Sequence, residues 1–321
     1  MRKNVSFILV TYYDRSGSSF LLNKLSEYKD VFVFPEGEIL VNIFLRTNRI
    51  WKKIELERLF REDRKLKKWG VEIENLESVQ KDIDNGSSGL EIFFSILFHL
   101  KEKKNPEASV IVFKAYELSL LKLSLLKERT GLEILIIFLI RDGRACYRSI
   151  RENLKCGRRQ AGSPEYHAIK WKSFVKKAIN EAGESIIIIK YENLVLGLED
   201  YLKKIFRLIG KNQMKDRGVK NAYYHQLDRR EKRIHKNIIY SAILDNVNRW
   251  KEELGTYEIA VFQKFAGDVI EAMGYEMLDV SFHGEKRIFL FFRRAYSFLK
   301  VIQHRYFWKR EIFLKYRRRM S

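Results

Sequence analysis

The sequence is short of cysteine and of long apolar runs, and each shortage excludes a class of protein. It has only two cysteines in 321 residues, Cys146 and Cys156, and no CxxC spacing, so we expect neither a disulfide framework nor a cysteine metal site. No apolar run is long enough to span a bilayer. The N-terminal run VSFILV is too short for a signal-peptide core. We therefore expect a cytoplasmic protein, soluble or peripheral to a membrane, that begins directly with its first strand.

Several catalytic signatures are missing as well. The sequence contains neither the GxxxxGK[ST] loop of kinases and ATPases nor the GxGxxG dinucleotide fingerprint. Its six histidines show no metal-ligand spacing, and no GxSxG or Cys–His arrangement accompanies them. We find no internal repeat. Any anion site in this chain must therefore be built differently, and we expect no metal.

What the chain does contain is apolar residues and positive charge. Hydrophobic residues make up 46% and aromatic residues 13%, which is enough for a sizeable core. The formal net charge of +21 favours anionic partners, namely nucleic acid, a membrane surface, or phosphorylated and sulfated small molecules. The stretch from Gly284 to Ser321 holds 12 Lys and Arg against 2 Glu, so nearly half of the excess lies in the tail.

The apolar residues are grouped into short runs that predict buried strands. Four runs rich in Ile, Val, Leu and Phe lie at 5–12, 109–116, 132–141 and 184–192, and a further short strand is expected at 31–34. They are nearly continuous rather than alternating, as expected of strands covered on both faces.

Helical patterns separate these strands. They lie at 18–28, in parts of 40–70, and at 90–103, 142–155, 165–182 and 197–209. A last helix is expected within 255–276, with Thr256 as its N-cap and Gly274 just past its end. Alternation of this kind predicts an α/β fold with a doubly wound parallel sheet flanked by helices. The charged segment 211–240 has weak periodicity, and we expect it to be either mobile or a functional lid.

The stretch RSGSSF, residues 15–20, connects the first strand to the first helix. The first amide groups of a helix lack partners inside it, and the helix dipole adds positive charge there. Gly17 allows close approach of the backbone, while serine hydroxyls and the Arg15 guanidinium would add donors. This turn is therefore a candidate oxyanion site. The alternative is that its serine and glycine residues simply cap the helix.

The stretch LIRDGRACYRSI, residues 139–150, repeats this logic after another buried strand. Ser149 follows Arg141 by eight residues, about two helical turns, so both can face one anion. The alternative for Arg144, Arg148 and Arg151 is solvated helix charge, the ordinary fate of such residues. Both stretches follow strands of one parallel sheet, at the edge where ligands bind in open α/β sheets.

Here the chain resembles the sulfotransferases that use 3′-phosphoadenosine-5′-phosphosulfate (PAPS), most of all the carbohydrate sulfotransferases and their bacterial relatives. RSGSSFL (15–21) resembles the family's 5′-phosphosulfate loop. LIRDGRACYRSI resembles its 3′-phosphate motif, usually written RDPR with a serine eight residues after the first arginine. Gly143 stands where proline is usual, and we expect it to loosen the turn.

Two longer stretches extend the resemblance. IKYENLVLGLEDYLKKIFRLIG (189–210) resembles the family's YEDL segment and the helix after it. VNRWKEELGTYEIAVFQKFAGDVIEAMGYE (247–276) resembles its C-terminal helix, which ends in LGY. Order and spacing agree over roughly residues 5–280, so we expect a sulfotransferase domain at 1–280 and a separate basic, amphipathic helical tail at 281–321.

The resemblance implies a P-loop-like sulfotransferase fold and a role for each matching residue. The residues expected to bind the 5′-phosphosulfate are Arg15, Ser16, Gly17, Ser18, Ser19 and Phe20, and those for the 3′-phosphate are Arg141 and Ser149. Arg15 would also stabilise charge on the leaving phosphate.

Further catalytic candidates lie just after the second expected strand and near the end of the third. Glu36 would be the general base, with Glu38 as the alternative, unless both are solvated loop carboxylates. Lys114 would touch the transferred sulfonate or cap the sheet edge, and Tyr116 and Glu117 lie close to it in sequence.

We therefore expect a PAPS-dependent sulfotransferase that modifies a hydroxyl, or less readily an amine, of a carbohydrate, glycolipid or small molecule. A nucleotide-dependent small-molecule kinase is one alternative, suggested by the strand–loop–helix turn. A basic nucleic-acid-binding protein is the other, suggested by charge, although no recognised nucleic-acid module is present. The tail, with its mixed aromatic and basic residues, would lie on an anionic membrane surface, dock on the body or on another chain, or bind nucleic acid.

Overall fold

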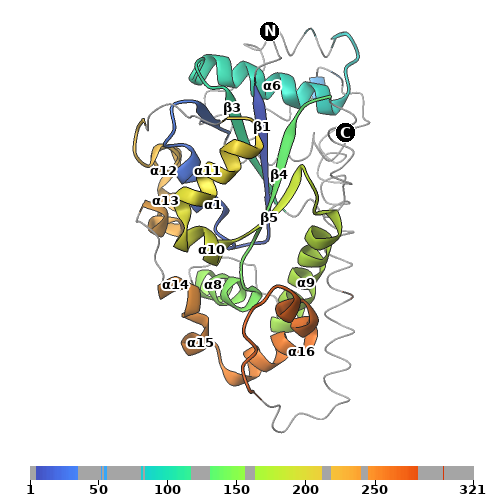
Figure 1. The fold of residues 1–321 in the computed structure, drawn as a ribbon, viewed down its shortest axis with the longest axis vertical. Helices are drawn as coiled ribbons and strands as arrows, with labels where there is room; N and C mark the ends of the chain where they lie inside the picture. The colour runs from blue at the N-terminus through green and yellow to red at the C-terminus, as the bar shows by residue number, and fades with distance from the viewer. Residues whose placement is uncertain are drawn as a thin grey trace.

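A computed structural model of the chain describes residues 5–34, 84–116, 131–155, 163–211, 218–239 and 245–280, with positions 52, 54, 55, 81 and 299. Its centre is a five-stranded sheet with the order β2-β3-β1-β4-β5, in which every pairing is parallel (Figure 1). The strands are β1 (Ser6–Tyr12), β2 (Val31–Val33), β3 (Val110–Tyr116), β4 (Ile134–Ile140) and β5 (Ile186–Lys190). The predicted α/β fold with a doubly wound parallel sheet is confirmed.

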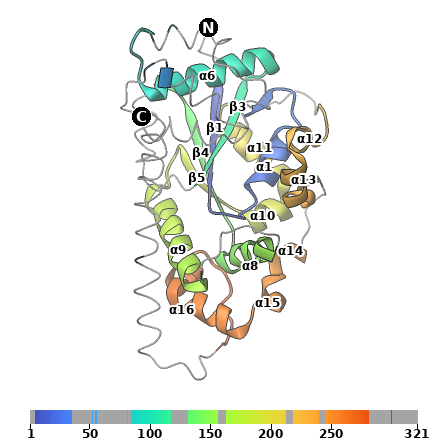
Figure 2. The same ribbon diagram turned by 180° about the vertical axis from the view of Figure 1, so that it is seen from behind.

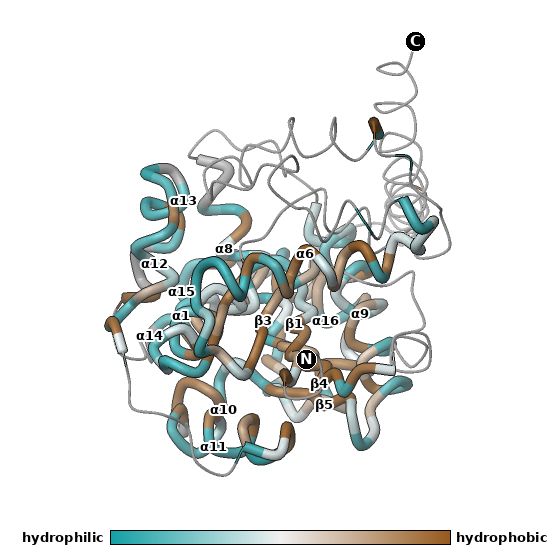
Figure 3. Tube along the Cα trace, turned by 90° about the horizontal axis from the view of Figure 1, so that it is seen from above, coloured by the Kyte–Doolittle hydropathy of each residue, from teal (hydrophilic) through white to brown (hydrophobic). Residues whose placement is uncertain are grey.

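The strands are apolar because helices cover both of their faces. All seven residues of β4 are buried. One face of the sheet packs against α1 (Ser18–Leu25), α10 (Tyr191–Leu196) and α11 (Leu198–Leu208). The other face packs against α6 (Gly89–Lys104) and α9 (Pro164–Glu181). Helices α8 (Gly143–Lys155) and α16 (Thr256–Ala272) join the same apolar cluster and lie beyond the carboxyl ends of the strands, as the two opposite views in Figures 1 and 2 show. In Figure 3 the strands form the brown centre of the molecule, with many teal positions on the helices around them.

Local sequence explains where most helices begin, with two corrections. Helix α6 starts after Ser88, whose side chain accepts from the Glu91 amide in a capping box. The N-cap of α16 is Gly255 rather than the predicted Thr256, because the Glu258 carboxylate accepts the Gly255 N–H at 2.9 Å. The predicted strand 184–192 also ends early, at Lys190, where α10 begins.

The segment 218–239 is folded onto the first helix. It forms α12 (Ala222–Gln226), α13 (Arg229–Ile234) and the 3-10 helix η2 (Lys236–Ile239). The Asn23 side chain of α1 donates to the Asn221 side chain at 2.8 Å and to the Ile238 carbonyl at 3.0 Å. Two short helices follow, α14 (Asp245–Asn248) and α15 (Trp250–Glu253). The described part of the charged segment is therefore attached to α1.

Some predictions concern residues outside the described ranges. These are most of the helical region 40–70 and nearly all of the tail 281–321. Among the residues that the structure does describe, no helix is both long enough and apolar enough to cross a membrane.

Candidate active site

The two candidate anion loops lie side by side because the strands before them are neighbours. β1 and β4 pair directly, and β3 pairs with β1 on its other side. The carboxyl ends of these three strands therefore lie together at one end of the sheet. The strands β2 and β3 lie on one side of β1, and β4 and β5 lie on its other side, so the order of the strands reverses between β1 and β4. This is the place where open α/β sheets bind ligands.

The turn after β1 has an unusual backbone. Arg15 has a φ of 67° and Gly17 a φ of 93°, both in the left-handed region. Only glycine adopts that region readily, so the conformation of Arg15 is a strained one that surrounding contacts must hold. The Ser16 amide and hydroxyl both donate to the Tyr13 carbonyl, at 3.2 and 2.8 Å, and so fix the turn.

The turn leads directly into the amino end of α1. Within the described ranges, no backbone carbonyl accepts from the amides of Gly17, Ser18 or Ser19. Amide groups of this kind, at the positive end of a helix dipole, are suited to an anion. Gly17 is also required for space, because a Cβ there would lie 2.3 Å from the Cδ2 atom of Tyr191.

Arg141, at the end of β4, reaches this same turn. Its guanidinium donates to the Arg15 carbonyl at 3.3 Å and to the Asn246 carbonyl at 2.6 Å. It lies over the Tyr191 ring, 4.8 Å from the ring centroid. Arg141 is 7% exposed, and its Nε has no hydrogen-bond partner among the described residues. A buried donor without a partner is costly, which fits a guanidinium that has capacity left for a ligand.

The remaining predicted residues join the two loops to each other and to β3. The Arg15 Nε donates to the Ser149 Oγ at 3.0 Å, so Arg15 touches both parts of the second motif. The Lys114 Nζ donates to the Ser19 Oγ at 3.3 Å and lies 5.2 Å from the Tyr12 ring centroid. The structure thus brings Arg15, Ser19, Lys114, Arg141 and Ser149 to one place.

Two of the predicted ligands point elsewhere. The Ser16 hydroxyl is committed to the Tyr13 carbonyl, so it serves the turn. The Phe20 ring lies in the core and meets the Tyr191 ring edge-on at 6.2 Å, while its amide donates to the Gly17 carbonyl at 2.9 Å. Phe20 therefore directs neither its side chain nor its N–H group toward an anion, because its ring packs in the core and its N–H is already bonded.

The arginines of α8 are structural rather than solvated. Arg144 is fully buried, binds both carboxylate oxygens of Asp142 at 3.0 and 2.7 Å, and stacks on the Trp250 ring at 3.8 Å. Arg148 pairs with Glu253 at 2.5 Å, and Arg151 is paired with Glu258. The alternative of solvated charge is wrong for Arg144 and Arg148, which are buried where α15 and α16 pack against this helix, while Arg151 is half-buried in its ion pair.

The turn at Gly143 is held rather than loosened. A Cβ at this position would lie 2.6 Å from the Trp171 ring and 2.7 Å from the Phe262 ring. Glycine therefore allows two aromatic rings to close on the start of α8. The Arg144 amide donates to the Asp142 carboxylate at 2.8 Å and caps the helix. The expectation of a looser turn is not supported.

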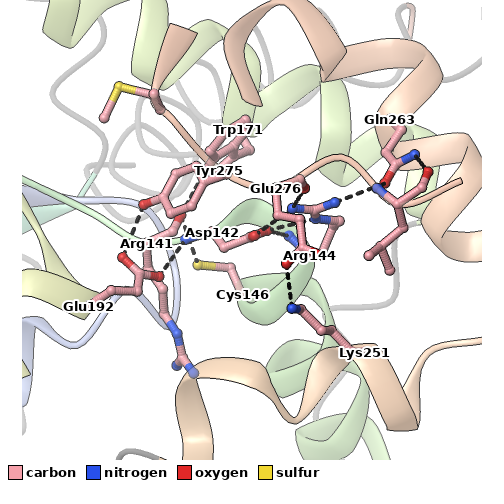
Figure 4. Close-up of polar contacts among 12 residues, drawn as sticks. Arg141, Asp142, Arg144, Cys146, Trp171, Glu192, Lys251, Gln263, Tyr275 and Glu276 are labelled. Atoms are coloured by element: carbon pink, nitrogen blue, oxygen red, sulfur yellow. Dashed lines mark hydrogen bonds and ion pairs between the residues drawn. The ribbon is translucent and has the colours of Figure 1, made fainter. Parts of the chain in front are cut away.

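A carboxylate that the sequence reasoning missed lies beside this turn. Glu192 accepts the Asp142 amide at 3.0 Å and the Tyr275 hydroxyl at 3.1 Å (Figure 4). Desolvation by burial raises the pKa of Glu192, while the hydrogen bond from the Asp142 amide and the Arg141 charge oppose the rise. Burial also raises the pKa of Tyr191. The signal in the sequence is the YEN stretch, which resembles the family's YEDL segment.

The base candidates are not placed. Glu36, Glu38 and Glu117 lie outside the described residues, and Tyr116 is described only as the last residue of β3. In the part of the chain that the structure covers, no group of three or more His, Cys, Asp or Glu residues could hold a metal ion.

Comparison with solved structures identifies the class of fold. The sulfotransferase domain from the curacin biosynthetic pathway is similar over 85% of this chain and 99% of its own, with a TM-score of 0.52 and 17% identity. The sulfotransferase domain of the Synechococcus PCC 7002 olefin synthase is similar over 86% and 98%, with a TM-score of 0.55 and 14% identity. No family model and no curated protein matches the sequence. The chain therefore has a sulfotransferase fold, and at these identities the likeness concerns the fold alone.

Proposed function

We propose that this protein is a sulfotransferase that transfers a sulfuryl group from PAPS to a hydroxyl group of an acceptor. The observation that carries the proposal is that Arg15 and Arg141 meet at the amino end of α1, where Arg141 donates to the Arg15 carbonyl and Arg15 donates to Ser149 of the second motif. Two cationic groups joined through one turn suit a ligand with two separate anionic groups. The sulfotransferase fold of the chain supports the same assignment.

The donor would supply an activated sulfuryl group, and the protein would supply charge and orientation. The amides of Gly17, Ser18 and Ser19 would bind the 5′-phosphosulfate, with Arg15 opposing the charge that develops on the leaving phosphate. The Lys114 ammonium, already at Ser19, would face the transferred sulfonate. Arg141, which has a buried Nε without a described partner, and Ser149 would bind the 3′-phosphate.

The acceptor side is proposed on sequence grounds. We assign the general base to Glu36, with Glu38 as the alternative, and the acceptor to a carbohydrate, glycolipid or small molecule. The two similar solved domains come from curacin and olefin biosynthesis, so a small lipophilic acceptor belongs among those to be tested. The basic tail at 281–321 would bring the enzyme to an anionic membrane surface.

Calorimetric titration with 3′,5′-adenosine bisphosphate tests the donor site. We expect tight binding by the wild type and a loss of about 10–100-fold in Arg141→Ala, the usual effect of removing charged hydrogen bonds. Arg207→Ala, an exposed arginine on α11, is the matched control and should bind as the wild type does. A preference for ATP with magnesium would indicate the kinase instead. Oligonucleotide binding that depends steeply on salt and is unchanged in Arg15→Ala would indicate a nucleic-acid binder.

Turnover tests the base separately. Glu36→Gln should keep binding of the bisphosphate and remove most transfer of labelled sulfate, because the side chain can no longer take a proton. Unchanged transfer would assign the base to another residue, with Glu38→Gln as the next variant.

A further inference from the structure

The backbone around Arg141 is held by groups that do not belong to the two anion motifs. The Arg141 carbonyl accepts the Trp171 indole N–H at 2.9 Å. The next amide along the chain, that of Asp142, donates to the Glu192 carboxylate at 3.0 Å. The carbonyl and the N–H of the peptide group between Arg141 and Asp142 are therefore both tied to other elements, α9 and α10.

Glu192 is itself held by a residue 83 positions later in the sequence. Its second oxygen accepts the Tyr275 hydroxyl at 3.1 Å. Tyr275 lies just after α16, in the GYE stretch of the sequence, and its ring is covered by Lys190 at 4.2 Å and by Trp171 at 6.3 Å between centroids. These contacts thus connect Tyr275, through the Glu192 carboxylate, to the backbone amide of Asp142, which follows Arg141.

The direction of these contacts distinguishes positioning from ligand binding. In Figure 4 the Arg141 side chain leaves the backbone away from Glu192 and Tyr275, and the Arg144 network lies on the other side of Asp142. Glu192 binds the backbone amide and leaves the Arg141 guanidinium to the Arg15 and Asn246 carbonyls. A carboxylate so placed can fix the orientation of the guanidinium without forming an ion pair with it.

We propose that Glu192 and Tyr275 are positioning residues for Arg141, and that they set the preference of the site for a nucleotide with a 3′-phosphate. The inference rests on the proposed function, since Arg141 is the group assigned to that phosphate. Loss of the Glu192 contact would release the Asp142 amide and let the guanidinium settle in other orientations. Binding of the rest of the nucleotide would be little affected.

The test is the ratio of the dissociation constants of 5′-AMP and 3′,5′-adenosine bisphosphate, measured by calorimetry on the full chain. We expect Glu192→Ala to lower this preference about tenfold and Tyr275→Phe about threefold, the range for one lost charged hydrogen bond. Glu192→Gln should stay within about twofold of the wild type, because its amide oxygen can accept the Asp142 N–H and its NH₂ can donate to Tyr275. Affinity for 5′-AMP should not change.

Matched controls come from a second carboxylate–tyrosine pair. Glu165, which is fully buried, accepts the Tyr257 hydroxyl at 2.9 Å between α9 and α16. Glu165→Ala and Tyr257→Phe should cost stability and leave the nucleotide preference unchanged. An equal loss of preference in these controls would overturn the inference, because it would reflect general loosening.

The possible failures are distinguishable. A wild type that binds both nucleotides equally, or neither, rejects the proposed function. A wild type that prefers the bisphosphate, together with Tyr275→Phe that keeps the full preference, rejects the positioning role, whether or not Glu192→Ala folds. Loss of preference in Tyr275→Phe and Glu192→Ala, with rescue in Glu192→Gln, supports it.

Discussion

Substitution of Gly17 by alanine should be unusually costly, because two separate penalties act at this position. Its φ of 93° is unfavourable for any residue with a Cβ, and that Cβ would lie 2.3 and 2.5 Å from two atoms of the Tyr191 ring. The first penalty is about 1–2 kcal/mol. The second is about 1–3 kcal/mol, the usual cost of overpacking. We expect Gly17→Ala to lower the free energy of unfolding by about 2–5 kcal/mol.

Chemical denaturation measures this loss, and the chain offers a matched control. Gly210 has a φ of 72°, and a Cβ at this position would have nothing within 4 Å, so Gly210→Ala has only the backbone penalty. The difference between the two variants isolates the contact with the Tyr191 ring. Equal losses would refute the reasoning, because they would mean that the ring moves aside without cost.

A second measurement connects this contact to the site. The Tyr191 ring also lies under the Arg141 guanidinium, so a displaced ring should weaken binding of 3′,5′-adenosine bisphosphate. In the double variant Gly17→Ala, Tyr191→Ala the steric part of the penalty disappears, and the two losses should not add. Strict additivity would contradict a direct contact.

Two further predictions concern the helix that carries the second motif. Gly143→Ala should lower the free energy of unfolding by about 1–3 kcal/mol, because the new Cβ would contact Trp171 and Phe262. Helix propensity alone would raise the free energy of unfolding, so a rise would contradict this prediction. The pKa of Glu253 is held below its ordinary value of 4.5 mainly by the hydrogen bond from Arg148. A lowered folded pKa stabilises the protein above that ordinary value, and the stabilisation is lost as the pH falls through the lowered one. Glu253→Gln should therefore be less stable than the wild type at neutral pH, and the gap should close in acid; a gap that does not change with pH would argue against the ion pair.

The local parts of the fold and site could be predicted because they depend on short stretches of sequence. Strand runs such as 132–141 are apolar along their whole length, and the turns after β1 and β4 carry their arginine, glycine and serine residues within a few positions. The sequence also placed Arg15 and Arg141 after strands, Lys114 near the end of a strand, and Ser149 two turns into the following helix, and the structure brings these residues together.

The errors came from side chains whose direction depends on distant elements. Phe20 follows the anion loop in sequence and yet faces the core, because α1 turns it toward Tyr191. Arginine is usually a surface residue, but Arg144 is buried because Asp142, Gln263 and Trp250 surround it.

The sequence by itself therefore determined the sheet, its order of alternation with helices, and the chemistry of two anion-binding turns, because hydrophobic periodicity and turn composition act over a few residues. Only the tertiary structure decided which charges face a ligand and which hold the protein together. That choice depends on which partners approach across the sheet edge, as Glu192 and Tyr275 do from positions far from Asp142 in sequence. The Arg144 guanidinium is structural because Asp142 and Gln263 bind it. Among the described residues, by contrast, the Arg141 guanidinium has no carboxylate partner and its buried Nε has no hydrogen-bond partner, which suits it to bind a ligand.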